Sequence, residues 1–183
     1  MNESSNAQDP HGLWSPITAA VVTAVPALAA LASGQVLLFP SLGPSAVMQA
    51  HSPNHESSRF YNVVVSHVVG LAAADLCVFA FGVAHTPSVF QAHAVSGGRA
   101  AAAVLAILIG TAVELALHAS HPPAASTTLL AALGSFRPTV HDTVLVVGGV
   151  LIVATAGEIA RRVRLGAREH RAARAADGSA RSV

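Results

Sequence analysis

Four long runs of apolar residues alternate along the chain with more polar connections. They cover residues 16–39, 61–82, 100–118 and 143–160. The first run has no charged residue in 24 positions, enough for a helix to cross a hydrocarbon layer of about 30 Å at ~1.5 Å per residue. The pattern therefore predicts four membrane-spanning α-helices.

Two other interpretations of the apolar runs are less consistent with the sequence. A soluble bundle would have to bury four helices that are apolar on every side, which a chain of 183 residues cannot do. A cleavable signal peptide requires a basic N-terminal region, whereas residues 1–15 contain Glu3 and Asp9 and no basic residue. Membrane insertion is the interpretation that remains.

Two shorter segments interrupt the pattern, one in each half of the chain. Residues 41–48 read SLGPSAVM, and residues 121–130 read HPPAASTTLL. Each has proline near its start, where a missing N–H costs nothing, and then continues with residues compatible with a helix. We predict two half-helices of roughly 10–14 residues. Residues 16–82 and 100–160 would then form an internal repeat of helix, half-helix and helix, both copies in the same orientation.

The two half-helices carry the chemistry expected of an anion site. A helix that begins inside a membrane directs free N–H groups and the positive end of its dipole at one spot. Hydroxyl donors lie close to both starts, at Ser41, Ser45, Ser126 and Thr127. The alternative is that both segments are proline-rich surface turns. Two such segments at matching places favour a binding site.

Ionisable residues inside apolar runs are costly and usually face a partner or a water-filled path. Glu114 and His118 are four residues apart and would share a helix face, with His121 just beyond. This set fits a structural hydrogen-bonded pair, a proton or substrate path, or a metal site. Asp75 fits either a neutral carboxyl paired with a neighbouring helix or a coupling group. The candidate proton-coupling residues are Asp75, Glu114 and His118.

One histidine lies near the start of the second apolar run. His67 follows Ser66 directly and comes shortly after Asn62. Its imidazole is a suitable donor to an anion, and histidine changes charge near neutral pH. The alternative is a packing histidine with satisfied hydrogen bonds.

The charges are few and unevenly distributed, with 10% of residues charged against about 25% in a typical soluble domain. Residues 1–160 carry three Arg and seven acidic residues, a net −4, whereas residues 161–183 carry seven Arg and two acidic residues, a net +5. A basic stretch after an apolar helix is typical of a cytoplasmic flank, so nucleic-acid binding is not expected. With four crossings, both termini are then predicted to be cytoplasmic. Cys77 is the single cysteine, which excludes an internal disulfide.

Several of these segments together resemble the HPP family of integral membrane proteins, over about residues 16–162. Family members are described as having four membrane-spanning segments, and some as nitrite transporters, so the resemblance implies an anion carrier or channel. This chain has Ala125 where the family usually has Gly, and Pro44-Ser45 where it usually has Gly-Ala or Gly-Thr. The segments that carry the resemblance are residues 39–47 (FPSLGPSAV), 51–53 (HSP), Asn62, 66–70 (SHVVG) and 121–129 (HPPAASTTL).

The sequence thus predicts an all-α, polytopic membrane protein of the cell membrane, with four transmembrane helices and two half-helices. A polar N-terminal tail (1–15) precedes the transmembrane domain (16–162), and an Arg-rich tail (163–183) is expected to be disordered. Small residues in the helices fit packing within one chain or a homo-oligomer in the lipid.

The expected function is transport of a small inorganic anion, with nitrite implied by the resemblance. No nucleophile with a base and an orienting group is visible, so no enzyme activity and no cofactor are expected. The alternatives are an intramembrane metal-dependent enzyme using Glu114, His118 and His121, or a non-transporting scaffold. The predicted substrate-binding residues are Ser41, Gly43, Ser45, Asn62, His67, His121, Ser126 and Thr127.

Overall fold

The computed structural model describes residues 13–180, and all regular structure in this range is helical. Residues 1–12, most of the expected N-terminal tail, lie outside the described residues. The helices are α1 (Trp14–Ser33), α2 (Leu42–His51), the 3-10 helix η1 (Glu56–Ser58), α3 (Phe60–Ala80), α4 (Val89–Ala92), α5 (Gly97–Ala116), α6 (Ala124–Ala132) and α7 (Val140–Ala180).

Four helices, α1, α3, α5 and α7, are long and apolar enough to cross a membrane. Their outward faces stay apolar: the side chains of Leu31 and Val104 are 81% and 73% exposed. A water-soluble protein rarely leaves apolar surface of this extent uncovered. The prediction of an all-α, polytopic membrane protein with four long helices is confirmed.

The first helix is shorter than its apolar run. α1 ends at Ser33 because Gly34 adopts a left-handed conformation (φ 66°) and its N–H bonds back to the Ala30 carbonyl. Residues 35–39 form no helix, although they continue the apolar run. This extended stretch leads into α2 after Pro40.

The last helix is longer than its apolar run. α7 continues to Ala180, through the Arg-rich stretch expected to be a disordered tail. Alanine and arginine dominate residues 167–176, and both have high intrinsic helix propensity. The Arg-rich segment is therefore an extension of a membrane helix.

The first half-helix completes a pass from one end of the bundle to the other. At the far end of α1, the ring of Phe39 packs edge-on against Phe136, which follows α6, with centroids 5.2 Å apart. At the near end, the Ser15 hydroxyl at the start of α1 donates to the carbonyl of Ala50, at the end of α2, over 3.5 Å. The non-helical residues 35–41 and α2 together thus return the chain to the end where α1 began.

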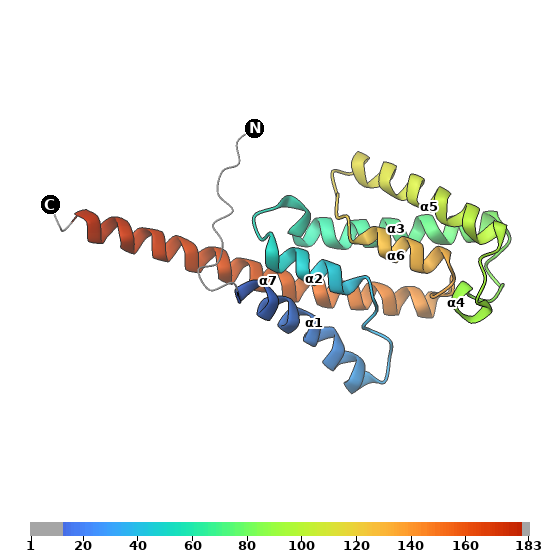
Figure 1. Cartoon of the computed structure of the whole chain (residues 1–183), viewed down its shortest axis with the longest axis horizontal. Helices are drawn as coiled ribbons and strands as arrows, with labels where there is room; N and C mark the ends of the chain where they lie inside the picture. The colour runs from blue at the N-terminus through green and yellow to red at the C-terminus, as the bar shows by residue number, and fades with distance from the viewer. Residues whose placement is uncertain (1–12, 181–183) are drawn as a thin grey trace.

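The second half-helix completes a pass in the opposite direction. Ser66, in the second turn of α3, donates to the Ala119 carbonyl, so the stretch before α6 runs beside the start of α3. Arg99, at the start of α5, donates from Nη1 to the Ala132 carbonyl at the end of α6, over 3.0 Å. Figure 1 shows α2 and α6 running away from each other out of the middle of the bundle.

The two halves of the chain are inverted, contrary to the same-orientation repeat that the sequence pattern predicts. Each half makes three passes, α1–α2–α3 and α5–α6–α7, and an odd number reverses the direction in which the second half starts (Figure 1). Six passes still return both ends of the described chain to one side. There, Arg164 Nη1 donates to the Ser15 hydroxyl over 3.4 Å.

Two glycines allow the discontinuous passes to pack closely against long helices. A Cβ at Gly70 of α3 would overlap the Thr128 hydroxyl of α6, and a Cβ at Gly149 of α7 would overlap the Leu37 carbonyl of the extended stretch. In lipid, such close backbone approach is a main source of helix packing energy.

Candidate functional site

The two half-helices begin next to each other inside the bundle. Ser41, the residue before α2, lies with its Oγ 2.6 Å from Thr127 Oγ1 in the first turn of α6. Ser45, in the first turn of α2, lies with its Oγ 2.9 Å from Nε2 of His121, just before α6. The prediction that the two half-helix starts converge is thus seen in the described structure.

A histidine of α3 joins the two half-helices. His67 Nε2 lies 3.0 Å from Ser45 Oγ, and its Nδ1 lies 2.6 Å from Thr127 Oγ1. The two imidazole rings have centroids 5.5 Å apart. We call Ser41, Ser45, His67, His121 and Thr127 the histidine–hydroxyl network; each of these side chains is at most 1% exposed.

A backbone carbonyl fixes the direction of one hydrogen bond at the edge of this network. His121 Nδ1 lies 2.6 Å from the Ser57 carbonyl, which can only accept, so Nδ1 carries a hydrogen. If both rings are neutral, His121 Nε2 accepts from the Ser45 hydroxyl over 2.9 Å, a shorter contact than the 3.2 Å from Ser45 Oγ to the Ser41 carbonyl, and the Ser45 oxygen accepts from His67 Nε2–H. His67 Nδ1 then accepts from the Thr127 hydroxyl.

The last donor in this series of hydrogen bonds is the hydroxyl of Ser41, which donates to the Thr127 oxygen when both rings are neutral. In the neutral state, every hydroxyl and ring N–H of the network therefore donates to another member or to the Ser57 carbonyl. Such a closed, satisfied arrangement is the stable way to bury five polar groups.

The free backbone N–H groups expected at the half-helix starts are mostly occupied. The N–H groups of Ala124, Ala125 and Ser126 donate to the carbonyls of residues 121–123, and that of Leu42 donates to Phe39. The expectation of a cluster of free N–H donors is therefore wrong for α6. What both helices direct at the network is the positive end of their dipoles.

The stretch before α6 is held by polar groups of α3 and α5. Ser66 donates to the Ala119 carbonyl, and Asn62 Nδ2 lies 3.5 Å from the Ser120 carbonyl. The carboxyl of Glu114 interacts with the Ser66 side chain and with the backbone N–H of His121. Glu114 thus interacts with the backbone of one network residue, His121, and not with the network side chains.

Three of the predicted substrate-binding residues lie outside the network. Asn62 holds the backbone before α6. Gly43 has open space where a side chain would lie, and Ser126 is partly exposed, one position before Thr127. The other five, Ser41, Ser45, His67, His121 and Thr127, form the network.

The predicted helix face of Glu114 and His118 is not formed. α5 ends at Ala116, and His118 is exposed, with a left-handed backbone (φ 52°). Both ring nitrogens of His121 are hydrogen-bonded. Among the side chains that the structure describes, no group of three or more His, Cys, Asp or Glu residues is placed to hold a metal ion.

Asp75 lies away from the network. It is partly buried on α3, eight residues after His67, which is ~12 Å along the helix.

Sequence reasoning missed two buried polar residues. Arg99 is 4% exposed and donates to the carbonyls of Ala132 and Thr86. It lines a polar cavity of about 600 Å³ that Arg137 also borders. Gln49 is 1% exposed and reaches the Ala154 carbonyl of α7. No spacing in the sequence marks either residue, since both lie at ends of helices whose packing was unknown.

The chain has two inverted halves, and each half contains a pass that is only partly helical. The two short helices begin at the same buried polar groups. This is the architecture of a class of polytopic membrane proteins that includes many secondary transporters. The comparison with known families agrees with the resemblance noted above. Residues 6–169 match the family model described as HPP, transmembrane region, and the chain belongs to the HPP family. No curated protein and no solved structure matches the chain.

Proposed function

We propose that this protein moves a small inorganic anion across the membrane by way of the histidine–hydroxyl network. The observation that supports this most is that both half-helices begin at the network, one from each inverted half. Nitrite is the substrate that the family resemblance suggests, and the proposal requires no cofactor.

The electrostatics of the network favour an anion over a cation. The positive ends of two helix dipoles point at it, and its five side chains include no carboxylate. Two imidazoles and three hydroxyls can all donate to an anion. The carboxyl of Glu114 interacts with the Ser66 side chain and with the backbone N–H of His121.

An anion enters this site together with a proton. In the neutral network every donor is already used, so an added anion finds no hydrogen to accept. If His121 Nε2 takes up a proton, it donates to Ser45 Oγ, and the Ser45 hydroxyl hydrogen can then turn from His121 to the anion in competition with the Ser41 carbonyl, which lies 3.2 Å from Ser45 Oγ. The imidazolium also compensates the buried negative charge, which is otherwise very costly. In this proposal the group that takes up the proton is His121.

Transport also requires a change of shape, because the network side chains are inaccessible in this structure. The polar cavity beside Arg99 and Arg137 lies at the end of the bundle opposite Ser15 and Arg164 and offers positive charge to an arriving anion. The Arg-rich end of α7 would face the cytoplasm, with both termini on that side.

The experiment is uptake of nitrite into liposomes containing the purified protein, with a pH-sensitive dye inside. We expect nitrite uptake and internal acidification together, both above protein-free liposomes. Thr127→Val keeps the side-chain shape but removes the hydroxyl between Ser41 and His67, and should reduce both signals. Ser126→Ala, one position away, serves as the matched control. Uptake equal to protein-free liposomes would contradict transport and favour a scaffold, and uptake without acidification would contradict the coupling.

A further inference from the structure

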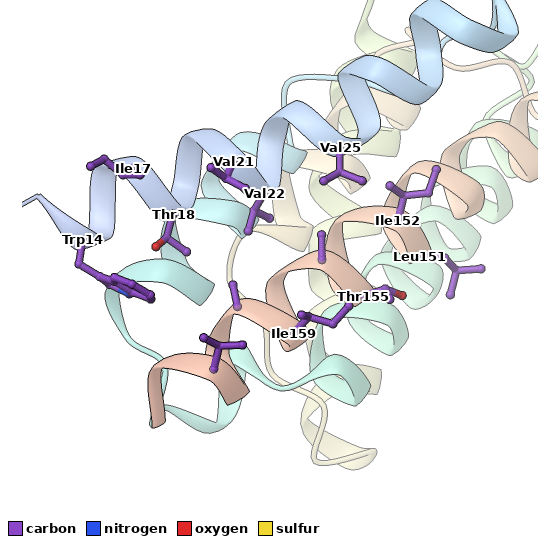
Figure 2. A pocket seen from close by; sticks show the side chains of 13 residues that line it. Trp14, Ile17, Thr18, Val21, Val22, Val25, Leu151, Ile152, Thr155 and Ile159 are labelled. Carbon is purple, nitrogen blue, oxygen red and sulfur yellow. The ribbon is translucent and has the colours of Figure 1, made fainter. Parts of the chain in front are cut away.

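A second feature lies on the outer surface, away from the network. α1 and the membrane part of α7 form the two walls of an apolar groove of about 820 Å³ (Figure 2). Apart from Trp14 and two threonines, its lining consists of Val, Ile, Leu and Ala side chains. α1 is the most lipid-exposed of the four long helices, so no other described element covers this groove.

The groove has the length of one leaflet of a bilayer. Along α1 it extends from Trp14 to Val25, which is ~17 Å at ~1.5 Å per residue. One leaflet contributes about half of the ~30 Å hydrocarbon layer. Trp14 marks the interfacial end, since tryptophan prefers the level of the lipid headgroups.

The interfacial end of the groove is positively charged. Residues 158–164 of α7 contain Arg161, Arg162 and Arg164 against one acid, Glu158, a net +2. Glu158 pairs with both Arg161 and Arg162. The Arg164 guanidinium lies over the Trp14 ring, 5.7 Å from its centroid. Arg164 is itself buried and donates to the Ala50 carbonyl over 2.6 Å, so this end combines an interfacial aromatic residue with one exposed arginine, Arg162, in a region of net positive charge.

We propose that this groove is a binding site for an anionic phospholipid. One acyl chain lies between α1 and α7, and the phosphate headgroup lies at the Trp14 end, close to Arg162, whose side chain is 76% exposed. The apolar walls need no hydrogen bonds from an acyl chain, and the net charge at the mouth complements a phosphate. This inference does not depend on what the histidine–hydroxyl network transports.

A second copy of the chain is a poorer occupant of the same groove. Two copies inserted in the same direction would place their Arg-bearing α7 ends at the same depth in the membrane. The two positive ends would then repel each other at the mouth of the groove. A negatively charged lipid meets attraction at the same place.

The chain contains a built-in probe, because Trp14 is its single tryptophan. The protein is placed in bilayers of phosphatidylcholine with a small fraction of phosphatidylglycerol, and one lipid at a time carries bromine on its acyl chain. Bromine quenches tryptophan fluorescence at short range. We expect brominated phosphatidylglycerol to quench Trp14 at a lower mole fraction than brominated phosphatidylcholine does.

Two variants test the headgroup and the groove separately. Arg162→Gln should lower the preference for phosphatidylglycerol roughly fivefold, whereas Arg137→Gln at the opposite end should not change it. Ala160→Phe fills the groove and should reduce quenching by the anionic lipid, whereas Ala112→Phe on the exposed face of α5 should not. Equal quenching by both lipids in the parent protein would overturn the proposal. If neither lipid quenched Trp14 and cysteines placed in the groove cross-linked two copies of the protein, the groove would be a dimer interface and the proposal would be overturned.

Discussion

Replacing Ser45 by alanine is the sharpest test of the network, because its hydroxyl connects both histidines. Ser45 Oγ lies 3.0 Å from His67 Nε2 and 2.9 Å from His121 Nε2. Its side chain is fully buried, so water cannot easily take the place of the missing oxygen. The substitution removes one acceptor and one donor at the point where α2, α3 and the start of α6 meet.

Two effects of Ser45→Ala have separate magnitudes. Leaving a buried polar group unsatisfied costs about 1–3 kcal/mol, which should lower the free energy of unfolding. In the proposed mechanism, protonation of His121 frees the Ser45 hydroxyl to donate to the anion. Without this hydroxyl, anion binding should weaken by about 1–2 kcal/mol, or roughly 5- to 30-fold in Kd. Removing one hydroxyl leaves all helices in place.

The measurements are thermal stability in detergent and nitrite binding by calorimetry, for Ser45→Ala beside the parent. Ser126→Ala is the control, since it deletes the same hydroxyl from a partly exposed residue of the neighbouring half-helix. We expect loss of stability and affinity in Ser45→Ala and little change in Ser126→Ala. Equal nitrite affinity in both variants and the parent would refute the placement of the anion at the network.

Three further predictions concern the fold and the coupling. In a chain lacking Cys77, a cysteine at Asn54 should be labelled from the same side as one at position 175, because α2 completes a pass; labelling from opposite sides would restore a re-entrant half-helix. Gly70→Ala should lower the melting temperature, since its Cβ overlaps Thr128, whereas Gly110→Ala should be tolerated; equal stability would contradict this packing. Glu114→Gln should change the pH profile of uptake, because its carboxyl contacts the His121 N–H, and an unaltered profile would exclude it from coupling.

Much of the architecture follows from hydrophobic pattern alone. The four long helices were predicted because each is apolar over about 20 residues, and the half-helices because proline stands close to each start. Five residues of the network were predicted because serine, threonine and histidine gather at these starts. Composition and position in the chain were enough for this.

The path of the chain before each half-helix was not predictable in the same way. Residues 36–39 are apolar and extend the first run, which favours a longer helix, but Gly34 ends α1 before them. The end of α5 at Ala116 likewise separates His118 from Glu114, which sequence spacing places on one face. Both differences come from backbone turns that side-chain periodicity does not report.

The inverted arrangement explains why two short helices make one site. In a same-orientation repeat, both half-helices would enter from one side with their dipoles parallel, and their positive ends would lie at equal depth but apart. With three passes in each half, α2 and α6 run in opposite directions from a common point (Figure 1). The positive ends of the two helix dipoles then face each other. Their potentials add where Ser41 meets Thr127 and oppose each other at long distance from the site. The non-helical stretches before α2 and α6 complete each pass. They therefore bring the starts of two ordinary helices together in a single buried site.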